Sequence, residues 1–115
     1  MGIQQIRGNL GEFAGAWWLS RNGFRILQRN WRTGRKEIDI IAEKNGTLHI
    51  IEVKTRFSDA FGWPEAAVSW KKIGMLEDAA RQYMALHPYW KNIQFSVLSL
   101  MVEHHMARFA FFEDI

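Results

Sequence analysis

The sequence predicts one α/β domain, residues 1–115, in which a mixed central β-sheet is flanked by helices. The chain of 115 residues is long enough for one hydrophobic core and too short for two. Apolar residues make up 48% of it and aromatic residues 14%, which is a globular composition. Segments with helical and strand periodicity follow one another in the order α-β-β-β-α-β-β, so two helices are available to cover one sheet.

The first element is expected to be a helix over residues 9–21. Gly23 is well placed to end it. Gly8, Gly11 and Gly15 lie on one side of this helix, a costly choice unless another part of the backbone comes close there. The apolar side chains at three- and four-residue spacing, expected to face the core, are Leu10, Phe13, Ala14, Trp17 and Trp18.

Three strands are expected next. Residues 24–32 form the first, and residues 37–44 and 47–56 form a hairpin. Asn45-Gly46 lies between these two apolar runs, and this dipeptide is the strongest short-range signal for a β-hairpin.

The second half of the chain predicts a long helix and two further strands. The helix is expected over residues 65–86, after a loop that ends in Pro64, since proline suits the first turn of a helix. Strands are expected over residues 93–102 and 106–112. The apolar stripe of this helix would comprise Ala67, Trp70, Ile73, Leu76, Ala80 and Tyr83.

The predicted hairpin brings charged residues together. With the loop centred on Asn45-Gly46, Asp39 would lie opposite Glu52 and Glu37 opposite Lys54, about 5 Å apart at Cβ. Period-two alternation places Glu52 and Lys54 on the same face. The other face of the hairpin would be core, with Ile38, Ile40, Ile51 and Val53.

Two opposed carboxylates repel each other unless a positive charge lies between them. Mg²⁺ binds oxygen ligands, and Asp39, Glu52 and the backbone carbonyl of Val53 could supply them. Such an ion can activate water and stabilise charge on a phosphodiester, while Lys54 orients the water or neutralises the developing charge. The alternative is a surface ion cluster in which Lys54 pairs with Glu37 and Glu52.

Basic residues gather on one segment of the chain. The formal net charge is +3, and no acidic residue lies between Phe13 and Lys36. This segment could follow a phosphate backbone, or it could be a solubilising surface. The candidate phosphate contacts are Arg25, Arg29, Arg32, Arg35 and Lys36, together with Arg56, Lys71 and Lys72.

A longer pattern runs through the chain in order: "RILQRNWR", "EIDIIA", "EVKTR" and "FGWPEAAV", preceded by Gly11-Glu12. It closely resembles the YraN family, small bacterial proteins of the PD-(D/E)XK nuclease-like superfamily. The resemblance implies a restriction-endonuclease-like fold with Asp39 and Glu52 as metal ligands and Lys54 as the superfamily's lysine. It also suggests Glu12 as a helix-borne acidic residue at the same site. One departure is Gln94-Phe95-Ser96, where the family usually has Arg-Phe-Asp.

The resulting functional prediction is a nucleic-acid-binding protein that hydrolyses phosphodiester bonds with Mg²⁺ or Mn²⁺. The expected partner is nucleic acid, DNA rather than RNA, branched or structured DNA included. Two alternatives stay open: a non-catalytic nucleic-acid-binding module with the same fold, and a structural protein that binds a partner. A homodimer would suit cleavage of two strands, by analogy.

The sequence also bears on location. It has no cysteine, so disulfides, thiolate metal sites and cysteine nucleophiles are excluded. Its longest apolar stretches fall well short of the roughly 20 residues that a membrane helix needs. No membrane association and a cytoplasmic location are therefore expected.

Overall fold

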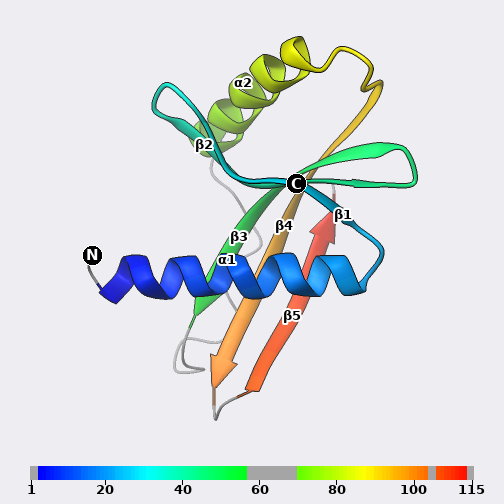
Figure 1. Ribbon diagram of the computed structural model, residues 1–115. Helices are drawn as coiled ribbons and strands as arrows, with labels where there is room; N and C mark the ends of the chain where they lie inside the picture. The colour runs from blue at the N-terminus through cyan, green and yellow to red at the C-terminus, as the bar shows by residue number, and fades with distance from the viewer. Residues whose placement is uncertain (1–2, 57–69, 104–105, 114–115) are drawn as a thin grey trace.

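The computed structural model describes residues 3–56, 70–103 and 106–113, with side chains from residue 9 onward. Their elements follow the predicted order α-β-β-β-α-β-β (Figure 1). They are α1 (Ile3–Arg21), β1 (Arg25–Thr33), β2 (Lys36–Lys44), β3 (Thr47–Arg56), α2 (Trp70–Leu86), β4 (Asn92–Glu103) and β5 (Met106–Glu113). The predicted start of the second helix at residue 65, and the loop before it, lie outside these residues.

One mixed five-stranded sheet has the strand order β1-β2-β3-β4-β5. The central pair, β3 and β4, is parallel, and the other three pairs are antiparallel. A parallel pair needs a crossover connection, and the segment that contains α2 provides it. The predicted α/β class is confirmed, and the arrangement is consistent with the restriction-endonuclease-like fold that the resemblance implied.

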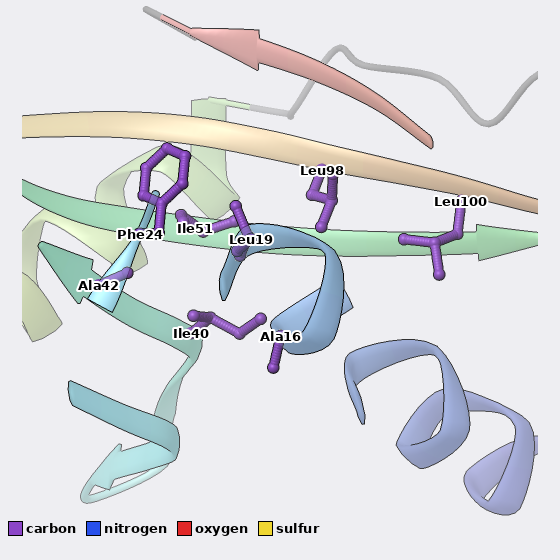
Figure 2. Packing of buried hydrophobic residues seen from close by; sticks show 8 residues of the cluster. All are labelled: Ala16, Leu19, Phe24, Ile40, Ala42, Ile51, Leu98 and Leu100. Carbon is purple, nitrogen blue, oxygen red and sulfur yellow. The ribbon is translucent and has the colours of Figure 1, made fainter. Parts of the chain in front are cut away.

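The two helices cover opposite faces of the sheet. Because successive side chains of a strand point to opposite faces, Ile51 packs toward α1 and Ile50 toward α2. Figure 2 shows the buried cluster beneath α1, which comprises Ala16, Leu19, Phe24, Ile40, Ala42, Ile51, Leu98 and Leu100. The cluster beneath α2 comprises Ile38, Ile41, Leu48, Ile50, Leu76, Ala79, Ala80 and Tyr83.

Two glycines let α1 lie close to the sheet. A Cβ atom on Gly11 would lie 2.2 Å from Thr55 Oγ1 of β3, and one on Gly15 would lie 3.0 Å from Leu98 Cδ2 of β4. Real Cβ atoms essentially never come as close as the first of these distances. The expectation that these glycines permit close backbone approach is therefore confirmed.

This close contact also decides which side of α1 faces solvent. The glycine side lies on the sheet, so the stripe of Leu10, Phe13 and Trp17 points outward and is 57%, 64% and 56% exposed. The expectation that these three side chains enter the core was wrong, because glycines pack closer than large side chains can. Trp70, also expected in the core, is 89% exposed. The helix begins at Ile3, six residues before the expected start.

The register of the β2–β3 hairpin was predicted correctly at its turn. Lys44 pairs with Thr47 and Ile40 with Ile51, around a two-residue turn in which Asn45 and Gly46 have φ angles of 53° and 82°. Positive φ at both positions is the signature of a type I′ turn, which matches the twist of the flanking strands.

Beyond the Ile40–Ile51 pair, β2 and β3 separate. β2 stays paired with β1 as far as Thr33–Lys36, while β3 stays paired with β4 as far as Arg56–Met101. The end of the β1–β2 hairpin lies beside α2 (Figure 1), where Lys36 Nζ is 3.4 Å from Asp78 Oδ2. The predicted ladder pairs of Asp39 with Glu52 and of Glu37 with Lys54 were therefore wrong.

β2 also changes face at the point of separation. Ile38 packs in the cluster beneath α2, whereas Ile40 packs beneath α1. The prediction that both share one core face was wrong, because the regular alternation of faces is interrupted between them, at Asp39, where β2 parts from β3. Within the described part of the chain, no helix is long and apolar enough to cross a membrane.

Candidate metal site where β2 and β3 separate

The separation of the strands leaves a backbone donor of β3 without its ladder partner, and a side chain of β2 binds it. Val53 N–H donates a hydrogen bond of 2.9 Å to Asp39 Oδ2. This bond fixes the Asp39 carboxylate at the mouth of the gap between the strands. Val53 was expected to contribute its carbonyl to a metal; the contact seen in the structure is made by its N–H.

Three carboxylates converge at this gap. One oxygen each from Glu12, Glu37 and Asp39 lies within 4.8 Å of the other two, and all three residues are half-buried. Glu37 precedes Asp39 by two positions in β2. Glu12 comes from α1, and it reaches the sheet because Gly11 beside it packs against Thr55.

Glu52 of β3 adjoins the same cluster. Its carboxyl group lies close to that of Asp39, as does that of Glu12, so the charges of these groups interact directly. One carboxyl oxygen of Glu12 and one of Glu52, both Oε2, are buried without a hydrogen-bond partner. The structure thus gathers Glu12, Asp39 and Glu52 of the predicted site, and adds Glu37.

The pKa values of three carboxyl groups in the cluster are raised. Burial, and then the negative charge of Asp39, raises the pKa of Glu12 and of Glu52 from 4.5 to about 7. Burial also raises the pKa of Asp39, against the Val53 N–H bond and the charge of Lys72, which lower it. The raised pKa values therefore reflect burial first and the repulsion between neighbouring carboxylates second.

The donor set fits a hard divalent cation. Mg²⁺ and Ca²⁺ take oxygen ligands, and two oxygens on opposite sides of one Mg²⁺ at about 2.1 Å lie about 4.2 Å apart. The oxygens of Glu12, Glu37 and Asp39, within 4.8 Å of one another, need only small side-chain movements to meet that geometry. Glu12 Oε2, which is buried without a hydrogen-bond partner, is a further acceptor, and Glu52 Oε2 is another whose nearest cation is Lys72.

Lysines border the cluster on the α2 side. Lys72 Nζ of α2 lies 3.6 Å from Glu52 Oε2. Lys54 lies two positions after Glu52 in β3 and, by the alternation of a strand, projects from the same face. Its position in the strand is compatible with the predicted role of Lys54 beside the cluster, which stays a prediction.

The predicted phosphate contacts divide into two groups. Several lie in ion pairs: Arg25 with Glu43 at 3.7 Å, Arg32 with Glu37 at 3.4 Å, Lys36 with Asp78 and Lys72 with Glu52. Arg35 and Lys71 are exposed, Arg56 is half-buried, and the guanidinium of Arg29 lies 5.5 Å from the centre of the Phe13 ring.

Sequence reasoning missed two residues of the site. Glu37 was considered only as an ion-pair partner, although its position two residues before Asp39 was a usable signal. Asn30 of β1 hydrogen-bonds to Glu12 and has a φ of 54°, which is uncommon for a residue other than glycine. Nothing in the sequence distinguishes Asn30 from other polar strand residues.

The departure from the family pattern lies in the paired part of the sheet. Ser96 of β4 is fully buried between Ile51 of β3 and Glu113 of β5, and its Oγ has no hydrogen-bond partner. It pairs with the last β3 residue that is still in register with β2, so it precedes the gap where the carboxylates converge.

Comparison with known proteins identifies relatives over most of the chain. The sequence model of the uncharacterised protein family UPF0102 matches residues 11–110. A UPF0102 protein of Syntrophomonas wolfei is 43% identical over 94 residues, covering 81% of this chain and 82% of the relative. One of Chlorobium phaeobacteroides is 45% identical over 93 residues, covering 80% and 73%, and one of Flavobacterium psychrophilum is 36% identical over 107 residues, covering 93% and 90%.

Proposed function

The chain belongs to the UPF0102 family, and we propose that it is a metal-dependent endonuclease that hydrolyses phosphodiester bonds in nucleic acid, in DNA rather than RNA. The observation that carries this proposal is the convergence of the carboxyl groups of Glu12, Glu37 and Asp39, with the carboxyl group of Glu52 close to that of Asp39. Four carboxyl groups at one gap in a sheet are costly to desolvate and mutually repulsive, so a purely structural role explains them poorly.

Each residue has a distinct role in the proposed reaction. Asp39, Glu12 and Glu37 would hold the divalent cation, Mg²⁺ or Mn²⁺, and Glu52 would complete the ligand set or accept a hydrogen bond from water. The cation would lower the pKa of that water and neutralise charge on the phosphodiester. Lys54 orients the attacking water or stabilises negative charge on the phosphorane, while Lys72 holds the Glu52 carboxylate in position.

Titration with Mn²⁺, with free Mn²⁺ read by EPR, tests the metal site without any assumption about substrate. We expect stoichiometric binding at low millimolar concentrations or below, lost in Asp39→Asn and in Glu37→Gln. Glu77→Gln is the matched control, because Glu77 is an exposed carboxylate of α2 outside the cluster. Equal binding by wild type and Asp39→Asn, with nucleic acid present as well as absent, would refute the metal site.

Cleavage assays on branched, duplex and single-stranded DNA then test turnover. We expect Mn²⁺- or Mg²⁺-dependent cleavage that Lys54→Met reduces by about 10²-fold or more, since general acid–base or charge-stabilising groups contribute on this scale. Metal binding and nucleic-acid binding without cleavage of any substrate would indicate the non-catalytic module instead. Neither kind of binding would indicate a structural protein.

A further inference from the structure

The outward side of α1 carries exposed aromatic side chains capped by arginines. Phe13 and Trp17 are 64% and 56% exposed, and they lie four positions apart and thus on one face of the helix. The guanidinium of Arg29 lies 5.5 Å from the Phe13 ring centre, and that of Arg21 lies 5.8 Å from the Trp17 ring centre. We call Phe13, Trp17, Arg21 and Arg29 the aromatic–arginine stripe.

From this stripe we infer that α1 binds single-stranded nucleic acid, with unpaired bases stacked on Phe13 and Trp17 and phosphates held by Arg21 and Arg29. Base–aromatic stacking tolerates any sequence, because every base has a π face, and arginine adds cation–π and phosphate contacts. The inference deepens the proposed function and rests on it: the bound strand is the one offered to the acidic cluster.

Charge complementarity favours a polyanion over an apolar partner on this surface. Within the part of the chain that the structure describes, neither Arg21 nor Arg29 forms an ion pair with an acidic side chain. The sequence between Phe13 and Lys36 has no acidic residue. A strand bound along the stripe would therefore meet positive charge and aromatic rings together.

The spacing of the rings favours an unstacked single strand. Four residues along an α-helix span about 6 Å. Successive bases in duplex DNA are about 3.4 Å apart along each strand. Phe13 and Trp17 could therefore each take one base of an extended strand, whereas the bases of an intact duplex are too close together and covered by their neighbours.

The stripe also borders the acidic cluster through two pairs of consecutive residues. Phe13 follows Glu12 in α1, and Arg29 precedes Asn30 in β1. Glu12 and Asn30 are hydrogen-bonded to each other at the cluster, while Phe13 and Arg29 meet at the stripe. A strand on the stripe consequently runs past the residues that would hold the metal.

Binding of labelled oligonucleotides in EDTA tests the inference without metal or turnover. The probes are an oligothymidine of about 16 nucleotides, the upper end of known site sizes for single-strand modules, and an abasic oligomer of equal length. We expect Phe13→Ala and Trp17→Ala each to weaken oligothymidine binding about tenfold, or ~1.4 kcal/mol, and to leave binding of the abasic oligomer unchanged. Trp17→Phe should restore most of the affinity.

Controls separate stacking from charge and DNA from RNA. Tyr89→Ala removes an aromatic ring that is 67% exposed and lies three residues after the end of α2, and it should leave binding unchanged. Arg29→Gln should lower the dependence of log K on log salt by about 0.7, the value for one phosphate of a single strand. An oligouridine of the same length, compared with oligothymidine, shows whether the stripe prefers RNA.

Three results would overturn the inference. One is equal affinity for the oligothymidine and the abasic oligomer. Another is unchanged binding in both Phe13→Ala and Trp17→Ala. The third is a wild-type dimer in sedimentation that Trp17→Ala dissociates while nucleic-acid binding stays the same, which would assign the surface to a second copy.

The two proposals can fail separately. Asp39→Asn alters neither the rings nor the arginines of the stripe, so the preference for oligothymidine over the abasic oligomer should persist in this variant although its Mn²⁺ binding is lost. If the wild type does not bind Mn²⁺ but binds oligothymidine through the stripe, only the endonuclease proposal is refuted. Metal-dependent cleavage with no effect of the stripe variants would refute the stripe alone.

Discussion

The two ends of the β2–β3 pair use the same kind of strand for different purposes. At the turn end, residues 40–44 pair with residues 47–51. The isoleucines of both strands and Leu48 of β3 are fully buried there. At the open end, β2 leaves with β1 and β3 stays with β4, and the side chains beside the gap are carboxylates and lysines. The turn end contributes buried apolar packing to stability, whereas the open end gathers charged side chains.

The difference shows how the end of a β-ladder can orient a functional side chain. Where two strands part, backbone donors lose their partners and must be satisfied by other groups. Here the Asp39 carboxylate accepts the Val53 N–H, so the loss of one ladder bond fixes the orientation of an acidic side chain. The open end is thus organised by hydrogen bonds to backbone, although it lacks the regular ladder of the turn end.

The largest expected effect is on stability at the turn end. Ile50→Ala removes a fully buried side chain beneath α2 and should lower the free energy of unfolding by about 2–5 kcal/mol. Mn²⁺ affinity of the folded variant should stay as in wild type. Urea denaturation and Mn²⁺ EPR measure the two quantities. Leu86→Ala, at a side chain that is 68% exposed, should change stability by no more than about 0.5 kcal/mol.

Gly11→Ala should affect both the fold and the open end. The new methyl group would overlap Thr55 Oγ1, so α1 must move outward, at a cost of about 1–3 kcal/mol. Because Glu12 follows Gly11, this shift should also weaken Mn²⁺ binding.

Gly74→Ala is the matched control, since nothing lies within 4 Å of a Cβ atom there. This substitution in α2 should stabilise the protein by about 0.5–1 kcal/mol and leave Mn²⁺ binding unchanged. A Gly11→Ala protein as stable as wild type would show that α1 does not depend on this close contact.

The pH dependence of metal-free stability should arise at the open end. The pKa values of Glu12 and Glu52 are raised in the folded protein from 4.5 to about 7, so the folded state binds more protons than the unfolded state between these values. The stabilisation they contribute is fully present below pH 4.5 and is lost as the pH rises through 7.

Thermal unfolding in EDTA at pH 5 and pH 8 measures this effect. We expect the melting temperature to be lower at pH 8 than at pH 5. The corresponding loss of unfolding free energy should be on the order of 1 kcal/mol, after allowance for the partial exposure of both side chains. Added Mn²⁺ should reverse the loss, with release of protons. Asp39→Asn should make the profile less steep, because burial is the main cause of both raised pKa values and the charge of Asp39 is the second; an equally steep profile in that variant would show that the Asp39 charge does not contribute.

The smallest effect is expected for the lysine that borders the open end. Lys72→Met removes the cation 3.6 Å from Glu52 and should raise the pKa of Glu52 further, as followed by NMR titration. Stability should fall by only about 0.2–1 kcal/mol, since the lysine side chain is 36% exposed. Lys71→Met, at the neighbouring exposed position, should leave the Glu52 titration unchanged.

The turn end of the hairpin could be predicted from sequence because its determinants are local. Asn45 and Gly46 tolerate positive φ, and this turn chemistry fixes the register of the residues next to it. The same register, continued to Asp39 and Glu52, failed because β2 is drawn away by β1 and α2. That competition depends on contacts between distant segments, such as Lys36 with Asp78.

The candidate site was predictable in part for a similar reason. The Asp39, Glu52 and Lys54 pattern is recognisable in sequence, and in the structure the carboxyl groups of Asp39 and Glu52 lie close together. Glu37 was overlooked because its expected partner was Lys54, across a pair that does not form. The outward stripe of α1 was placed in the core, since helical spacing alone does not tell a glycine side that can approach a sheet from an aromatic side that cannot.

The parallel pairing of β3 with β4 has a consequence for biosynthesis. Glu12, Glu37, Asp39 and Glu52 all precede the crossover, so every carboxylate of the cluster leaves the ribosome before β4 does. At roughly 5–20 residues per second, the edge of β3 that β4 will cover stays unpaired for several seconds. Free apolar strand edges invite aggregation, and charged side chains oppose it. We therefore expect the charged side chains of Glu52, Lys54 and Arg56 to oppose aggregation of the nascent chain during this interval.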